Sequence, residues 1–265
     1  MTDREELLRG ESLGKRFGGL RAVHQVSLSV RAGEVLGLIG PNGAGKSTIV
    51  NLLAGTTPVD TGRVRLLGRD ITRAPAHRRA RLGLVRTFQR NTTFPMVTGT
   101  DVVMAGLSSR ATDTFGCWLS RPWLAHARRR RLITEAAARL TEVGLEDVLL
   151  GASRDIPVGT LPPAVNRMLG FTLAMATAPK VLVLDEPCAG LAPSARDMLS
   201  ARIRQAATTG IGVLVIEHDV GFIMRGCDRV LALDHGVVIA HGTPEQVRAD
   251  PAVRQAYLGD DDAAS

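Results

Sequence analysis

Short apolar runs separated by glycine-rich turns dominate both ends of the chain. Apolar and polar residues alternate over residues 26–30, and a continuous apolar run follows at 35–39. This pattern predicts strands, some of them in hairpins. Further along, apolar runs at 181–184 and 211–216 flank a helical pattern that begins at Ser194. Fully apolar strands separated by helices are typical of a parallel sheet that helices cover on both faces.

The middle of the chain has a different pattern. Residues from about 92 to 165 show mostly helical periodicity, with a long amphipathic stretch from about Trp123 to Val143. Toward the C-terminus, Thr243 precedes a proline and Gln246 follows three residues later, which predicts a capped helix start. The sequence therefore predicts an α/β core interrupted by a helical insertion.

Composition narrows the possible classes of protein. The chain has 265 residues with a formal net charge of +7, and 45% of the residues are hydrophobic, which allows a sizeable core and argues against global disorder. Only three of the 33 basic residues are lysines, so the positive charge reflects an arginine bias and is weak evidence for nucleic-acid binding. We interpret the basic runs at 77–81 and 128–131 as solvated helix faces, and the alternative is contact with anionic lipid headgroups or a membrane partner.

Targeting signals and cysteine motifs are not evident. The apolar runs are far shorter than the ~18 residues that span a bilayer, and the charged N-terminus does not resemble a signal peptide. The cysteines at 117, 188 and 227 form no paired motif, which suits a reducing cytoplasm. We expect a cytoplasmic protein that does not cross a membrane by itself, with Cys188 as a small core residue.

A phosphate-binding loop is the most specific motif. Residues 40–48 match the pattern G-x-x-x-x-G-K-[ST] between an apolar strand and a helix, which is the context that the motif requires. Its glycines let backbone N–H groups surround a phosphate, and the helix N-terminus adds partial positive charge. We expect Lys46 to contact the β- and γ-phosphates and the Ser47 hydroxyl to bind Mg²⁺. The predicted nucleotide-binding residues are Gly40, Pro41, Asn42, Gly43, Ala44, Gly45, Lys46, Ser47 and Thr48.

Two carboxylates follow the apolar strand at 181–184, namely Asp185 and Glu186. Unpaired charge is costly at the end of a buried strand, and α/β sheets place ligands at the carboxyl ends of their strands. We expect Asp185 to hold Mg²⁺ and Glu186 to polarise the attacking water. The simpler alternative is a strand that ends in acidic turn residues.

With these two segments, the sequence resembles the ATP-binding subunits of ABC transporters over nearly its whole length. Residues 40–48 look like the Walker A motif, and residues 181–187 look like the Walker B motif with its catalytic glutamate. The resemblance implies that Gln89, in a Q-loop, contacts the metal and that His218, in an H-loop, senses the γ-phosphate. It also implies that Phe17 stacks on adenine.

The same resemblance implies the fold. We expect an α/β P-loop NTPase (RecA-like) core with a mainly parallel sheet, an N-terminal antiparallel β subdomain and a helical insertion subdomain. Residues 1–90 and 180–265 would form the nucleotide-binding core with the β subdomain, and residues 91–179 the helical subdomain. Residues 189–193 look like the family's D-loop.

A narrower resemblance is to the ATPases of branched-chain amino acid importers. It is carried by residues 16–23, 86–89, 118–131, 241–247 and 250–259. It implies ATP and Mg²⁺ as cofactors and ATP hydrolysis coupled to uptake of a small solute, with branched-chain amino acids as the expected cargo. The implied partners are membrane-spanning permease subunits, a second ATPase subunit and, indirectly, an external solute-binding protein, with no nucleic acid. The protein would lie peripherally on the inner face of the cell membrane.

The family's signature motif is degenerate in this chain. Where the family usually has L-S-x-G-Q, 24 residues before the Walker B aspartate, the sequence has Leu161, Pro162, Pro163, Ala164 and Val165. In the family this segment contacts the γ-phosphate held by the opposite subunit, and prolines have no N–H to donate. Loss of two hydrogen bonds to a charged group would weaken that contact by about 10²- to 10⁴-fold. The prolines can also serve simply to start a helix.

Head-to-tail pairing of ABC ATPases makes this defect one-sided. The Walker A motif of this chain is completed by the signature of its partner, so we expect an asymmetric heterodimer. Two alternatives remain open at this stage. One is an ATP-dependent regulatory switch with little catalysis, and the other is a non-transport ABC protein that acts on nucleic acid or ribosomes.

Overall fold

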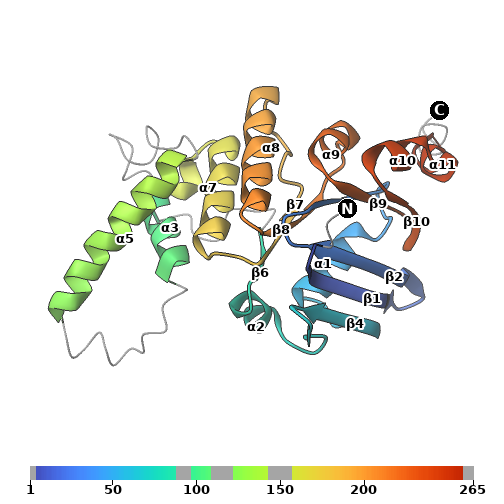
Figure 1. The fold of residues 1–265 in the computed structure, drawn as a ribbon, viewed down its shortest axis with the longest axis horizontal. Helices are drawn as coiled ribbons and strands as arrows, with labels where there is room; N and C mark the ends of the chain where they lie inside the picture. The colour runs from blue at the N-terminus through green and yellow to red at the C-terminus, as the bar shows by residue number, and fades with distance from the viewer. Residues whose placement is uncertain (1–3, 88–96, 109–121, 143–156, 259–265) are drawn as a thin grey trace. The chain divides into compact units, whose positions relative to one another are not determined.

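The computed structural model describes residues 4–87, 97–108, 122–142 and 157–258 (Figure 1). The chain divides into two compact units. The first comprises Met1–Thr87, Lys180–Ala189 and Pro193–Ser265, and the second comprises Phe88–Pro179 and Gly190–Ala192.

A six-stranded sheet forms the centre of the first unit, with the strand order β10-β9-β3-β8-β7-β6. All neighbours in it are parallel except β10, which pairs antiparallel with β9. The strands are β3 (Val35–Ile39), β6 (Leu84–Arg86), β7 (Val181–Asp185), β8 (Gly212–Ile216), β9 (Arg229–Asp234) and β10 (Val237–Gly242). Every residue of β3, β7 and β8 is buried, as expected for strands covered on both faces.

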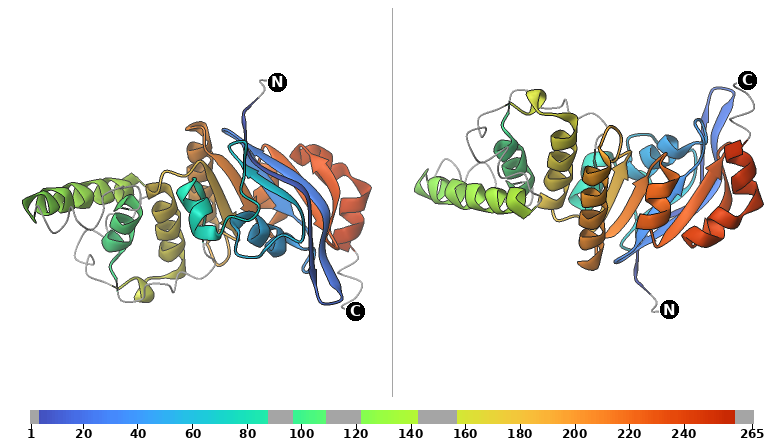
Figure 2. Two further views of the ribbon diagram at one scale, coloured as in Figure 1. Left: turned by 90° about the horizontal axis from the view of Figure 1, so that it is seen from below. Right: turned by 90° about the horizontal axis from the view of Figure 1, so that it is seen from above.

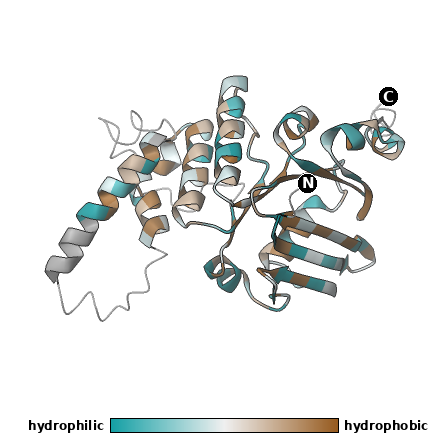
Figure 3. Cartoon of the chain, viewed as in Figure 1, coloured by the Kyte–Doolittle hydropathy of each residue, from teal (hydrophilic) through white to brown (hydrophobic). Residues whose placement is uncertain are grey.

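A four-stranded antiparallel sheet with the order β2-β1-β4-β5 completes the unit. Its strands are β1 (Glu6–Phe17), β2 (Leu20–Arg31), β4 (Thr61–Leu66) and β5 (Arg69–Asp70). Hydrophilic and hydrophobic positions alternate along β1, β2 and β4 (Figure 3), as in a sheet with one face on the core. The fold class predicted from the sequence is confirmed in both sheets.

Helix α1 (Lys46–Ala54) contacts strands of both sheets, namely β1, β2, β6 and β7, and β2 also contacts β8 and β10 (Figure 2). The unit therefore packs as layers around α1, with Ile49, Leu52 and Leu53 fully buried in the core. The remaining helices of the unit are α2 (Ala76–Arg81), α8 (Pro193–Thr208), α9 (Val220–Gly226), α10 (Pro244–Ala249) and α11 (Pro251–Leu258). The predicted capping box at Thr243 is confirmed, because its side chain and that of Gln246 each accept a backbone N–H.

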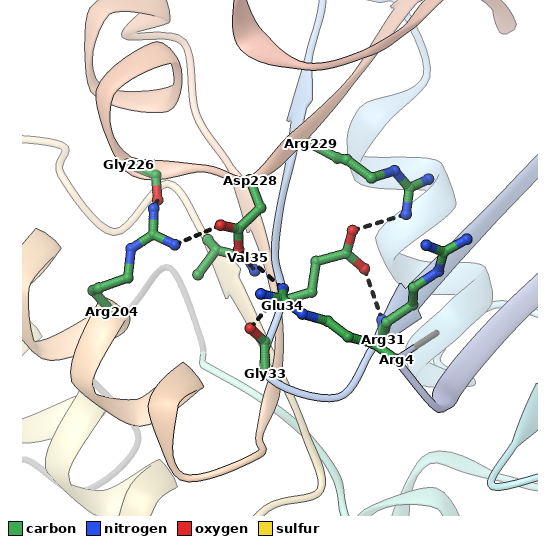
Figure 4. A network of polar contacts seen from close by, with 9 residues as sticks. All are labelled: Arg4, Arg31, Gly33, Glu34, Val35, Arg204, Gly226, Asp228 and Arg229. Carbon is green, nitrogen blue, oxygen red and sulfur yellow. Dashed lines mark hydrogen bonds and ion pairs between the residues drawn. The ribbon is translucent and has the colours of Figure 1, made fainter. Parts of the chain in front are cut away.

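A network of polar contacts ties together the amino ends of β3 and β9 (Figure 4). The buried Glu34 accepts hydrogen bonds from the Arg31 N–H and the Arg229 guanidinium, both at 2.8 Å. Asp228 accepts from the Val35 N–H at 2.8 Å and from Arg204 at 2.7 Å. The charges at this end of the sheet are thus paired, and the network lies apart from the nucleotide motifs.

The second unit is helical. It contains α3 (Gly99–Ser108), α5 (Pro122–Glu142), the 3₁₀ turn η1 (Val158–Thr160) and α7 (Pro163–Ala176), and α3 packs against both α5 and α7. Gly106 permits close packing of α3 on α7, since a Cβ there would lie 2.9 Å from the Leu173 side chain. The long amphipathic stretch predicted from the sequence is α5. Within the described segments, no helix is both long and apolar enough to cross a membrane.

Candidate functional site

The phosphate loop lies between β3 and α1, as its sequence context predicts. Gly45 caps α1 in the left-handed region, with φ of 98° and no side-chain hydrogen bond. A Cβ at this position would lie 2.5 Å from the carbonyl oxygen of Ala22, so only glycine fits without a shift. The loop therefore presents a helix N-terminus without a side-chain cap, a geometry that favours anions.

Lys46 lies against the loop itself. Its Nζ donates hydrogen bonds to the carbonyl oxygens of Gly40 at 2.5 Å and Pro41 at 2.8 Å. Burial lowers the pKa of Lys46, while the nearby Glu186 and Asp185 act in the opposite direction. This buried ammonium group is held by neutral acceptors, and an anionic ligand in the loop would offer it a stronger partner.

Parallel pairing of β7 with β8 brings the acidic pair next to His218. Asp185 ends β7 opposite Ile216, the last residue of β8, so the residues that follow each strand emerge side by side. The Glu186 N–H donates to the Ile216 carbonyl at 2.9 Å, and its Oε1 lies 2.9 Å from Nε2 of His218. Glu186 has a φ of 49°, a backbone strain that non-glycine residues adopt where the surroundings require it.

A cavity of about 520 Å³ joins these elements. Its lining includes Phe17, the loop residues Asn42 to Thr48, Glu186 and His218. Phe17 ends β1 with half of its surface exposed, and its ring lies 5.5 Å from Nζ of Lys15. The cavity therefore brings together an aromatic ring, a phosphate loop and the Glu186–His218 pair from four separate parts of the sequence.

Three further features of this region escaped the sequence reasoning. Arg21 and His235 also line the cavity, one from β2 and the other from the turn between β9 and β10, and the sequence reasoning gave neither of them a role in the site. Glu217 is buried and accepts hydrogen bonds from the N–H groups of Cys188 at 2.5 Å and His218 at 3.2 Å. Burial raises the pKa of Glu217. Its position directly before His218, at the end of an apolar strand, is the one signal that could have singled it out.

The donor set suits Mg²⁺. One oxygen of Asp185, Oδ2, is 2.7 Å from Nη2 of Arg86, while Oδ1 is buried and has no hydrogen-bond partner among the described residues. Ser47, which carries a hydroxyl, is among the residues that line the cavity. No cluster of three or more histidine, cysteine or acidic side chains fit for a metal occurs in the described ranges. A carboxylate and a hydroxyl combined with phosphate oxygens are the ligands that Mg²⁺ prefers.

Comparison with known proteins identifies the family of the chain. The sequence model of the ABC transporter family matches residues 23–189, more than half of the chain. This chain belongs to the ABC transporter family. A second family model, described as the branched-chain amino acid ATP-binding cassette transporter family, matches residues 237–263. As an ABC ATPase, the chain binds ATP.

Relatives of this ABC ATPase are similar over almost their whole length. The high-affinity branched-chain amino acid transport ATP-binding protein BraF of Pseudomonas aeruginosa is 38% identical, with 96% of this chain and 98% of the relative covered. LivG of Salmonella typhimurium, with the same description, is 37% identical, with 97% and 99% covered. The crystal structure of a nucleotide-free ATP-binding cassette from an ABC transporter matches with a TM-score of 0.80 at 29% identity, covering 95% of this chain and 98% of that one.

The residues that the sequence predicts to be a degenerate signature, Leu161 to Val165, lie in the helical unit of this ABC ATPase. Leu161 is buried after η1, Pro162 is the N-cap of α7, and Pro163 is its first residue. The prolines therefore start the helix, as the simpler interpretation expects. That role does not restore the N–H groups that they lack.

Three other expectations have different outcomes. Gln89 lies outside the described residues. The run at 77–81 is not wholly a solvated face, because Arg79 is only 1% exposed. Its guanidinium donates to the carbonyl oxygens of Leu52 and Leu53, at the end of α1. It also donates to the carbonyl oxygens of Thr72 and Ala74. Cys188 is buried, as predicted.

Proposed function

We propose that this protein is the ATP-hydrolysing subunit of an importer for branched-chain amino acids. The observation that carries the proposal is the cavity in which the phosphate loop with Lys46 faces the Glu186–His218 pair. The two relatives named for branched-chain amino acid transport support the choice of cargo. Residues 1–90 and 180–265 serve as the nucleotide-binding core, and residues 91–179 as the helical part.

Each residue has a distinct chemical task. Lys46 and the loop amides hold the β- and γ-phosphates, and Phe17 stacks on the adenine ring. Glu186 accepts a proton from the water that attacks the γ-phosphorus, and the bond to the β-phosphate oxygen breaks to leave ADP and phosphate. His218 contacts the γ-phosphate and is held by Glu186.

Mg²⁺ has Ser47, Asp185 and Gln89 as its proposed protein ligands. When bound, it neutralises charge on the β- and γ-phosphate oxygens. The free Oδ1 of Asp185 supports this assignment, because a buried carboxylate oxygen without a partner is costly.

The proposed partners are a second ATPase subunit, permease subunits and an external binding protein, and the signature residues bear on the first of them. A second ATPase subunit with an intact signature completes the site on this chain, whereas the site on that partner faces Pro162 and Pro163 and turns over slowly. Permease subunits position the pair on the cytoplasmic face of the membrane, and an external binding protein delivers the amino acid. The named relatives do not favour a regulatory switch or a protein that acts on nucleic acid.

Reconstitution tests the proposal. The chain is assembled in liposomes with the permeases, the partner ATPase and the binding protein, and uptake of labelled leucine is followed with and without ATP. We expect uptake that requires ATP and Mg²⁺ and stops in a Lys46→Ala variant. If the purified chain binds no ATP in the presence of Mg²⁺, the proposed function is wrong. If it binds ATP but leucine uptake is absent, the choice of cargo is wrong.

A further inference from the structure

We propose that Arg86 is a positioning residue that fixes Asp185 and helix α1 relative to each other and so sets the affinity of the site for its divalent cation. The inference rests on the proposed function to the extent that Asp185 and Ser47 bind the metal. Arg86 itself would touch neither nucleotide nor metal. It would act through the side chains that it holds.

Sheet register brings Arg86 and Asp185 to the same face. Arg86 ends β6 and pairs with Val183 of the parallel strand β7. Because side chains alternate along a strand, Val183 and Asp185 point to one face, and the register partner of Val183 shares it. Helix α1 contacts both strands. The two charges therefore meet under the helix that begins in the phosphate loop.

The guanidinium bridges the two elements with separate nitrogens. Nη2 donates to Oδ2 of Asp185 at 2.7 Å, and Nη1 donates to Oδ1 of Asn51 at 2.6 Å. Asn51 lies one helical turn after Ser47 on α1, so the two side chains share a face of the helix. One planar group thus connects the carboxylate ligand to the helix that carries the hydroxyl ligand.

The contact between Arg86 and Asp185 is largely shielded from water. The Asp185 side chain is 1% exposed and that of Arg86 is 17% exposed, so water competes weakly for either group. Arg86 occupies only one oxygen of the carboxylate, and Oδ1 has no partner in the part of the chain that the structure describes. A single contact fixes the carboxylate orientation while it leaves the second oxygen for another ligand. Residues that orient metal ligands commonly change metal affinity when they are replaced.

Arg86 is the last residue of β6 and stands three residues before Gln89 in the sequence, the third proposed ligand. An ion pair with a purely structural role would stabilise the fold without altering metal affinity. Metal affinity is therefore the property that separates the two roles.

The test measures metal binding directly rather than turnover. Free Mn²⁺ is titrated by electron paramagnetic resonance with purified chain and a non-hydrolysable ATP analogue, for the wild type and for Arg86→Gln, Arg86→Lys and Asn51→Ala. The matched control is Arg229→Gln, which breaks a 2.8 Å pair with the buried Glu34 away from the cavity. Binding of a fluorescent ATP analogue in EDTA reports the nucleotide site without metal, and thermal unfolding reports the fold.

We expect Arg86→Gln to weaken Mn²⁺ binding about 10- to 100-fold. Its affinity for the ATP analogue in EDTA should stay within about twofold of wild type, and so should the Mn²⁺ affinity of the Arg229→Gln control. If Arg86→Gln does not fold, Arg86→Lys carries the test, because a lysine ammonium lacks the planar fork that bridges two acceptors. If the folded Arg86 variants bind Mn²⁺ within about twofold of wild type, this inference is wrong, but the proposed function is unaffected. Failure of the wild type to bind the analogue at all would overturn the proposed function with it.

Discussion

Nε2 of His218 lies 2.9 Å from Oε1 of Glu186, at the point where two neighbouring parallel strands end. Neither residue belongs to a strand, yet the backbone N–H of each is held by a hydrogen-bond acceptor. Glu186 donates its N–H to Ile216, and the His218 N–H donates to the buried Glu217. The pair is thus placed by the backbone at the edge of the sheet, facing the phosphate loop across one cavity.

Replacing Glu186 tests this arrangement. Glu186→Gln keeps an oxygen that can accept from His218 but removes the anion that takes a proton from water. We expect ATP affinity within about twofold of wild type and turnover reduced by about 10²- to 10⁴-fold. Turnover is measured with the partner subunit present, and Glu245→Gln, on an exposed position of α10, is the control. Unchanged turnover would remove Glu186 from its role.

Restoring the signature should raise the activity of the chain on its own. The combined substitutions Pro162→Ser, Ala164→Gly and Val165→Gln return a hydroxyl and an N–H, while Pro163 still starts α7. We expect homodimer turnover to rise by roughly 10²- to 10⁴-fold, the size of two hydrogen bonds to a charged group. Adding Lys46→Ala must abolish the gain. Equal turnover before and after the repair would argue against a defective signature.

Phe17 should contribute to nucleotide affinity by stacking. Its ring is half exposed at the cavity, and stacking of a base on an aromatic side chain contributes about 1–3 kcal/mol. Phe17→Ala should therefore raise the dissociation constant for ATP by about 5- to 150-fold, whereas Phe17→Trp should retain affinity. Met198→Ala removes another exposed apolar side chain, which lies outside the cavity. This control should leave the dissociation constant for ATP, measured by calorimetric titration, unchanged.

Arg79 is predicted to stabilise the fold rather than the chemistry. Its removal takes the guanidinium donor away from the carbonyl oxygens of Leu52 and Leu53 at the end of α1, where it lies at 2.7 and 2.6 Å. We expect Arg79→Met to lower the free energy of unfolding by about 2–4 kcal/mol, measured by urea denaturation. The neighbouring Arg78 is exposed, so Arg78→Met is the matched control. A loss no larger than in that control would contradict the prediction.

Glu217 should make stability depend on pH. Burial raises its pKa above the ordinary value of 4.5, so the folded state binds the proton more tightly than the unfolded state. The stability of the wild type relative to Glu217→Gln should then fall as the pH rises from the ordinary carboxyl pKa to the raised one, and level off above it.

Glu245 provides a control of opposite sign. Hydrogen bonds from its own N–H and from Thr243 lower the pKa of Glu245, so the wild type should gain stability relative to Glu245→Gln as the pH rises. Urea denaturation of both variants across pH 4 to 8 measures the two trends. The same trend for both, or no trend at Glu217, would contradict the prediction.

The sequence by itself determined the parts that depend on consecutive residues. The phosphate loop, the apolar strands, the acidic pair and the helix starts at Pro163 and Thr243 each need a short pattern of residue types, since local backbone geometry and burial set them. The fold class followed from the alternation of such elements, and the family resemblance singled out His218 and Phe17.

Only the tertiary structure decided which of these parts meet. Arg86, Arg79 and Glu217 are charged residues that a hydropathy pattern assigns to the surface, yet each is buried or nearly so, because acceptors or donors from distant segments surround it. Strand order places β8 beside β7 and so brings Glu186 to His218. Such neighbours depend on packing between elements far apart in the chain, which no short stretch of sequence encodes.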